Sequence, residues 1–152
     1  MIKIKPHHFM DIIKLYGKGI EMFIPDDKYN HNFYYVANEI IKNHHIHIKI
    51  TLEQDDICLP CKYLGKEGRC IDTIDHINDV SFKNEWNQII DNRIIENSNV
   101  LANSIHSAHE YCKILYSVKE NIFDVWKEET NSDKYDRYNY FCLGAEKYLG
   151  IL

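Results

Sequence analysis

Three cysteines that lie close together in the chain are its most chemically distinctive feature. Cys58, Cys61 and Cys70 form a C-x2-C-x8-C set. Two thiolates three residues apart can bind one metal, and the nearby glycines let the returning chain bring a third thiolate. The spacing therefore predicts a metal centre in this loop, either an iron-sulfur cluster or a zinc ion, because thiolates accept both.

A tetrahedral zinc ion or a cubane cluster needs four ligand positions, and several side chains are candidates for the fourth. His7 and His8 follow a short strand that is expected to pair with the strand leading into Cys58. Adjacent histidines project in different directions, so only one of the two is expected to bind. Cys112 and Cys142 fall on apolar helical stripes, where a buried structural cysteine is the commoner role, and either thiol remains a candidate ligand.

The fourth position decides between several functions. A three-cysteine cluster without a fourth protein ligand leaves one iron open to bind a substrate as a Lewis acid, which would make the protein an enzyme. A closed site indicates structure or electron transfer. One alternative is a zinc-stabilised module that binds another protein. A second is a dithiol oxidoreductase using Cys58 and Cys61, which Gly65 and Gly68 disfavour because that chemistry usually needs a helix starting at the first cysteine.

Histidines and aspartates upstream of the cysteines are further candidates. His45 and His47 share a face of an expected strand, and together with His44 they form a possible metal-binding tract. The solvated face of an edge strand is the simpler explanation for them. Asp55 and Asp56 directly precede the first cysteine, where they could orient metal ligands or accept backbone hydrogen bonds in a turn.

The elements that must position the cysteine loop are mostly helical. Residues 1–5 and 45–52 alternate apolar and polar side chains, which predicts two strands that pair into a small sheet. Apolar residues at helical spacing predict helices over about 7–16, 26–41, 81–94, 107–125 and 133–149. The expected fold is α+β: a mainly helical single domain, residues 1–152, with a two-stranded sheet that leads into the cysteine-rich loop.

Composition excludes several classes of protein. The chain has 152 residues and a net charge of -5 with both signs scattered, so it has no basic stripe for nucleic acid. No apolar run approaches the roughly 18 residues of a membrane span. Five cysteines, an odd number, with no apolar leader in front favour reduced thiols. We therefore expect a cytoplasmic protein that binds neither nucleic acid nor membranes; the sequence does not define its protein partner or small-molecule substrate.

Short motifs in the first half of the chain resemble a known family. They are Pro6-His7-His8-Phe9-Met10, Tyr16-Gly17-Lys18-Gly19 and Asp55-Asp56-Ile57-Cys58, followed by Cys61 and Cys70. This pattern resembles small bacterial and archaeal proteins described as domain of unknown function 1284, which are suspected of binding an iron-sulfur cluster. The resemblance implies a metal centre at these cysteines. Family members tend to carry a cysteine where this chain has Asp11, a weaker ligand for iron, which implies a labile or open fourth position.

These observations together predict an iron-sulfur protein with a [4Fe-4S] cluster. It would act as a small redox carrier or as an enzyme that uses an open iron. The predicted cysteine ligands are Cys58, Cys61 and Cys70. The candidates for the fourth position are His8, Asp11 and Cys112.

Overall fold

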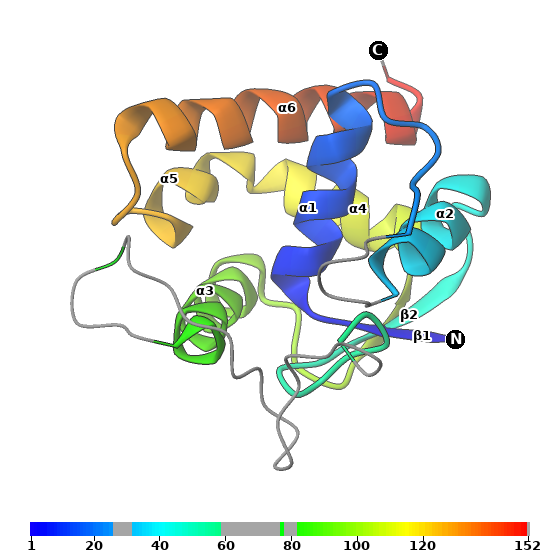
Figure 1. Cartoon of the computed structure of the whole chain (residues 1–152), viewed down its shortest axis with the longest axis horizontal. Helices are drawn as coiled ribbons and strands as arrows, with labels where there is room; N and C mark the ends of the chain where they lie inside the picture. Colours follow the sequence, from blue (N-terminus) through cyan, green and yellow to red (C-terminus); the bar gives the residue numbers. More distant parts are fainter. Residues whose placement is uncertain (26–31, 59–76, 78–81, 152) are drawn as a thin grey trace.

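The computed structural model of the chain describes residues 1–25, 32–58, 77 and 82–151. Helices dominate this part of the chain, and a small sheet lies to one side of them (Figure 1). Among the described residues, no helix is both long enough and apolar enough to cross a membrane. Cys61, Cys70 and the expected helix starts at Asp26 and Ser81 lie outside the described residues.

The sheet has three strands in the order β1-β2-β3. β1 (Ile2–Ile4) pairs in parallel with β2 (His47–Ile50), which confirms the expected pairing of these two segments. β3 (Ile105–Ser107) pairs antiparallel with the other edge of β2, so the prediction of two strands was wrong. β3 is an edge strand whose three residues are exposed or half-buried. It therefore lacks the alternation of apolar and polar residues from which a strand is predicted.

Six α-helices are described, and four of them were expected at close to their observed places. They are α1 (Pro6–Gly17), α2 (Phe33–Lys42), α3 (Lys83–Ser98), α4 (Ala108–Ser117), α5 (Ile122–Val125) and α6 (Asn131–Leu149). α2 begins several residues later than the apolar spacing predicted. The single helix expected over 107–125 is instead α4, a 3-10 turn at Lys119–Asn121 and α5. Apolar side chains keep their helical spacing across this break, so the spacing alone could not reveal it.

Helix ends follow the expected local chemistry. Pro6 is the first residue of α1, where its missing N–H costs nothing. The Ser107 hydroxyl accepts a hydrogen bond from the Glu110 N–H at 3.0 Å and caps α4, as the sequence predicts. Thr130 caps α6 in the same way, and Gly150 closes that helix with a φ of 72°.

α1 crosses α6 at very close range (Figure 1). A Cβ built at Gly144 would overlap the carbonyl oxygen of Ile13, and one built at Gly17 would overlap that of Tyr140. Only glycine permits backbones to approach this closely. The crossing therefore fixes how the start of α1, with its two histidines, lies relative to α6.

Candidate metal centre and the adjoining pocket

The buried carboxylate of Asp55 joins the start of α1 to the turn that carries Cys58. Asp55 follows β2 and is 2% exposed. Its Oδ2 accepts hydrogen bonds from the Lys5 N–H at 2.9 Å and from His8 Nδ1 at 2.7 Å. Its Oδ1 accepts from the N–H groups of Ile57 at 3.2 Å and Cys58 at 3.1 Å. One side chain therefore holds both a predicted metal-binding histidine and a predicted metal-binding cysteine in place.

The charge on Asp55 fixes the protonation of His8. Burial acts to raise the pKa of the Asp55 carboxyl, but His8 and the Lys5 N–H outweigh it and hold that pKa below its usual range. An ionised carboxylate only accepts hydrogen bonds, so His8 carries its proton on Nδ1 and has a lone pair on Nε2. Burial lowers the pKa of His8, which favours the neutral imidazole that metals bind.

His8, Asp55 and Cys58 bring their ligand atoms within 4.8 Å of one another, and they are the one group of three of this kind among the described residues. Two ligands on one zinc or iron ion, each at about 2.0–2.3 Å, are at most about 4.6 Å apart. The spacing of the group is therefore close to that of ligands on one metal ion. Asp55 already accepts four hydrogen bonds, so of the three groups His8 and Cys58 are the candidate ligands and Asp55 is the group that orients them.

The other predicted ligands are placed differently. Cys61 and Cys70 lie outside the described residues. Cys112 is fully buried in α4, where burial raises the pKa of its thiol, and Cys142 is half-buried on α6. Neither thiol belongs to the group of three around Asp55, which is the only one found in the described part of the chain. Their packing matches the structural role that apolar helical stripes favour for cysteine.

His7 is held by a second carboxylate, that of Asp91 on α3. The His7 Nδ1 lies 2.9 and 3.0 Å from the two Asp91 oxygens, and the His7 N–H donates to Oδ1 at 2.8 Å. Burial acts to lower the pKa of His7, but Asp91, itself 1% exposed, outweighs it and raises that pKa. We expected the side chains of His7 and His8 to project in different directions. They do bind different carboxylates, but their rings lie side by side, with centroids 4.2 Å apart.

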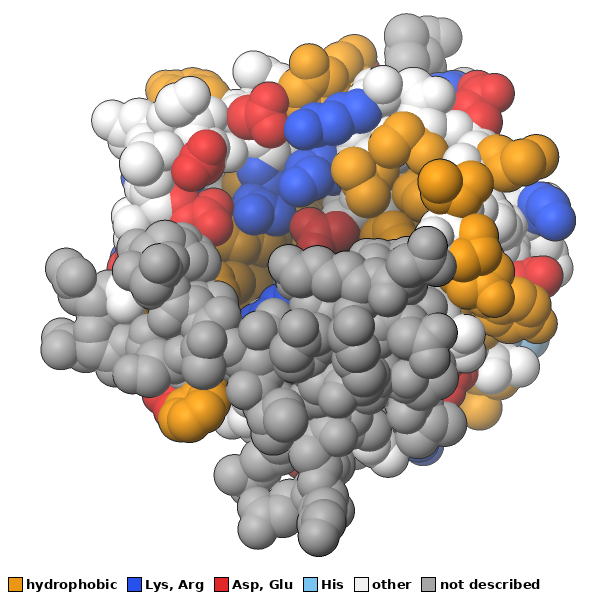
Figure 2. All heavy atoms as spheres, in the orientation of Figure 1, with side chains coloured by type: hydrophobic (Ala, Val, Ile, Leu, Met, Phe, Trp, Pro, Cys, Tyr) orange, Lys and Arg blue, Asp and Glu red, His pale blue; other side chains and the backbone are white. Residues whose placement is uncertain are grey.

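Both histidines line a polar pocket of about 230 Å³. α1 contributes His7, His8 and Asp11 to its wall. α3 contributes Lys83, Trp86, Asn87 and Ile90. The last part of the chain contributes Trp126, Glu129 and Arg137. The space-filling view shows the surface hollowed below α6, with basic, acidic and hydrophobic side chains at the edge of the hollow (Figure 2).

Asp11 belongs to this pocket and is paired with Arg137. The Arg137 guanidinium donates to Asp11 Oδ1 at 3.1 Å and to Glu129 Oε1 at 3.4 Å, and it stacks on the Trp126 ring at 4.1 Å. Burial acts to raise the pKa of Asp11, but Arg137 and Lys14 outweigh it and lower that pKa. Asp11 is thus an ionised partner of an arginine, which is a different role from the fourth metal ligand that the sequence suggested.

The histidines around β2 form no metal site of three ligands within the described residues. His44 stacks on Tyr148 with a centroid separation of 3.8 Å, and His45 lies 5.9 Å from His109. His45 and His47 are exposed. β2 is the central strand of the sheet, so the expectation of an edge strand was wrong, whereas the exposure of His45 and His47 fits a solvated face.

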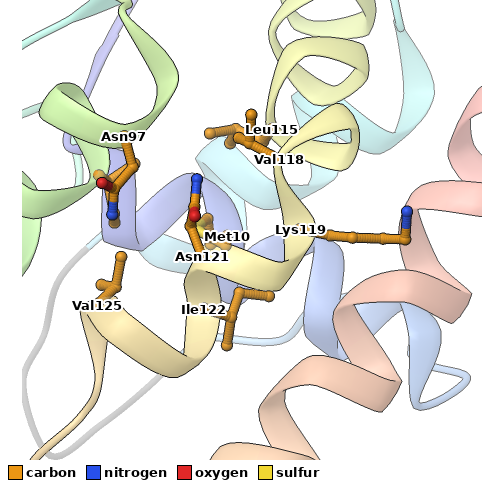
Figure 3. Close-up of a pocket in the computed structure, with 9 residues that line it drawn as sticks. Met10, Asn97, Leu115, Val118, Lys119, Asn121, Ile122 and Val125 are labelled. Atoms are coloured by element: carbon orange, nitrogen blue, oxygen red, sulfur yellow. The ribbon is translucent and has the colours of Figure 1, made fainter.

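A second hollow, of about 20 Å³, lies between α1, α3, α4 and α5 (Figure 3). Met10, Leu115, Ile122 and Val125 surround it. A volume of this size holds about one water molecule, and most of the wall is apolar. We regard it as a packing gap rather than a binding site.

Several pocket residues were not singled out from the sequence. Asn87 and Asp91 are four residues apart on α3, next to the buried Trp86 and Ile90. Both are buried although they are polar. A polar pair at this spacing beside an apolar stripe is the one sequence signal that could have identified them. Arg137 offers no comparable signal, because its neighbours along α6 are mostly polar and exposed.

The chain matches no protein-family model, no curated protein and no solved structure in comparisons with each. The resemblance to domain of unknown function 1284 therefore stays an expectation. What can be inferred about function rests on the residues and their geometry.

Proposed function

We propose that this chain is a metal-binding protein of the iron-sulfur class, with its centre held by thiolates of the cysteine loop and by His8. The loop thiolates are those of Cys58, Cys61 and Cys70, as the spacing predicts. The observation that carries the proposal is that Asp55 binds both the His8 ring and the Cys58 backbone, with the three ligand groups within 4.8 Å.

The arrangement around Asp55 is the kind that metal proteins use. A metal-binding histidine usually donates its second ring N–H to a carboxylate, which fixes the tautomer and the orientation of the ring. His8 and Asp55 have this relation at 2.7 Å. Burying a carboxylate costs free energy, even when both oxygens accept hydrogen bonds, and a surface turn does not require it. The position of Asp55 therefore supports a site that needs a fixed geometry.

An enzyme is a better fit than a pure electron carrier. His8 belongs both to the group of ligand atoms and to the wall of the polar pocket, so a small molecule in that pocket would lie beside the metal centre. An imidazole ligand is also easier to displace from iron than a thiolate, which suits a site where one position must open for substrate. When bound, the metal would supply Lewis-acid chemistry to that substrate.

Replacing Cys58 with alanine tests the proposal. We expect the Cys58→Ala protein to lose at least about nine-tenths of the bound metal, because structural thiolate sites lose affinity steeply with each ligand removed. Cys142→Ala is the matched control: the thiol is half-buried on α6, and its removal should leave metal content unchanged. The readout is metal per chain after purification without oxygen.

Equal metal in the Cys58→Ala and wild-type proteins would contradict the proposal. The His8→Ala variant tests the fourth ligand separately from the cysteines. We expect this variant to retain the metal but to lose it to a chelator at least about ten times faster than wild type. The reason is that mutating a residue that supports a metal site typically lowers metal affinity by about 10- to 100-fold. A chelation rate equal to that of wild type would remove His8 from the site.

A further inference from the structure

His45 and His109 lie opposite each other where the chain enters β2 and leaves β3. β2 and β3 pair antiparallel, with His47 opposite Ser107. Continuing this register two residues beyond that pair, backwards from His47 and forwards from Ser107, places His45 opposite His109. Their ring centroids are 5.9 Å apart. The pairing of the strands therefore brings together two histidines that are far apart in the sequence.

Backbone hydrogen bonds hold the two segments against each other beyond the end of the strands. The Ala108 N–H donates to the carbonyl of Ile46 at 2.9 Å, and the His109 N–H donates to the carbonyl of His44 at 2.7 Å. The start of α4 lies beside the entry to β2 for this reason (Figure 1). The backbone thus fixes where both histidines stand, which is the support that a metal site needs.

The two imidazoles have no other polar partner within the described residues. His45 is exposed and His109 is half-buried, and neither ring forms a hydrogen bond or an ion pair in that part of the chain. Two protonated imidazoles at opposite positions would repel each other. A divalent cation between two neutral imidazoles would instead bind both.

The distance between the rings suits one ion that both share. An ion about 2.0 Å from each ligand nitrogen places the ring centroids about 5 Å apart at a tetrahedral angle, and about 6 Å apart when the nitrogens lie on opposite sides. The observed 5.9 Å lies in this range. Imidazole nitrogen suits zinc, nickel and copper ions, whereas calcium and magnesium prefer oxygen ligands.

His44 is a third imidazole next to this pair. Its ring donates a hydrogen bond to the backbone carbonyl of Ile41 and stacks on Tyr148 at 3.8 Å. Burial, together with the nearby His109 and His45, outweighs that hydrogen bond and lowers the pKa of His44, which favours the neutral ring. The nitrogens of the three histidines do not all lie within 4.8 Å of one another, so His44 borders a site of two ligands.

We propose that His45 and His109 form a second metal site, which binds a divalent ion such as Zn²⁺ or Ni²⁺ and shares no residue with the cysteine loop. Two protein ligands leave positions on the ion open. His109 also lines a hollow of about 380 Å³, together with Lys113, Tyr116 and Leu149, so a small ligand of the ion would have room there. The bound ion would join the entry of β2 to the start of α4.

Titration calorimetry with Ni²⁺ tests this site on the protein as purified without oxygen, with the metal that it then carries. We expect His45→Ala and His109→Ala each to weaken Ni²⁺ binding at least about ten-fold, a loss that even a supporting residue of a metal site typically causes. His47→Ala is the matched control, because His47 is exposed on the same segment and lies opposite Ser107 instead. It should bind Ni²⁺ as wild type does.

Ni²⁺ should also raise the unfolding temperature of wild type and of His47→Ala, because an ion that binds only the folded chain stabilises it. His45→Ala should show no such rise. Since His45 is exposed, this variant tests the site even where His109→Ala folds poorly. Equal Ni²⁺ affinity in wild type and His45→Ala would overturn the proposal, and so would a loss in His47→Ala as large as in His45→Ala.

The same titration on Cys58→Ala separates this site from the cysteine loop. Ni²⁺ binding that survives in Cys58→Ala and is lost in His45→Ala supports the histidine pair, whatever metal the loop holds. Ni²⁺ binding that is lost in Cys58→Ala and kept in His45→Ala assigns the ion to the loop and overturns the pair. Iron content measured on the same samples tests the proposed function independently.

Discussion

Asp55→Ala is expected to lower the free energy of unfolding by about 4 kcal/mol, because it leaves several buried donors without an acceptor at a cost of about 1–3 kcal/mol each. Four donors would lose their acceptor: the backbone N–H groups of Lys5, Ile57 and Cys58, and His8 Nδ1. With Asp55 2% exposed, water cannot freely replace the carboxylate. Denaturant unfolding followed by circular dichroism measures the change.

Asp56→Ala is the control for this prediction. Asp56 is the next residue, and its side chain accepts one exposed hydrogen bond, from the Lys3 N–H at 2.9 Å. We expect a loss of about 1 kcal/mol or less. Similar losses for both variants would mean that Asp55 stabilises the turn only as an ordinary polar residue does, and the link between α1 and Cys58 would lose its main support.

Gly144→Ala should destabilise the protein by about 3 kcal/mol, although alanine is the better helix former by about 1 kcal/mol. The new Cβ would overlap the backbone carbonyl oxygen of Ile13. Because backbone cannot rotate away as a side chain can, α1 and α6 must move apart. The two energies have opposite signs, so the direction of the measured change tests the close crossing by itself.

Leu143→Ala provides the comparison on α6, since Leu143 is 44% exposed and its truncation should cost less than about 1 kcal/mol. A Gly144→Ala protein as stable as wild type, or more stable, would show that the helices do not touch as described. The separation should also disturb the pocket, because α1 carries His7 and His8 and α6 carries Arg137. We therefore expect the fluorescence of Trp86 and Trp126 to change in Gly144→Ala alone.

Local patterns predicted most of the secondary structure correctly. Ile2, Ile4, Ile48 and Ile50 alternate with polar neighbours, and they do become the buried face of paired strands. The capping box at Ser107 and the closing Gly150 lie where predicted. β3 and the break after α4 were missed because edge strands and 3-10 turns leave little trace in apolar spacing.

The site was only partly predictable, for a physical reason. The approach of His8 to Cys58 could be predicted, because His8 follows β1, Cys58 follows β2, and the two strands were expected to pair. Asp91 and Arg137 reach the pocket from α3 and α6, and no pattern in the sequence sets how those helices lie against α1. Gly17 and Gly144 set one of these arrangements, and their spacing in the chain gives no sign of it.

Metal and acid-labile sulfide analysis, with an absorption spectrum, on protein purified without oxygen tests the central claim most directly. The proposed function predicts a brown protein that holds iron and sulfide in equal amounts, both lost in Cys58→Ala. A colourless protein with one zinc ion and no sulfide would contradict an iron-sulfur centre and indicate a zinc-stabilised module. Protein that holds neither metal would contradict the site itself.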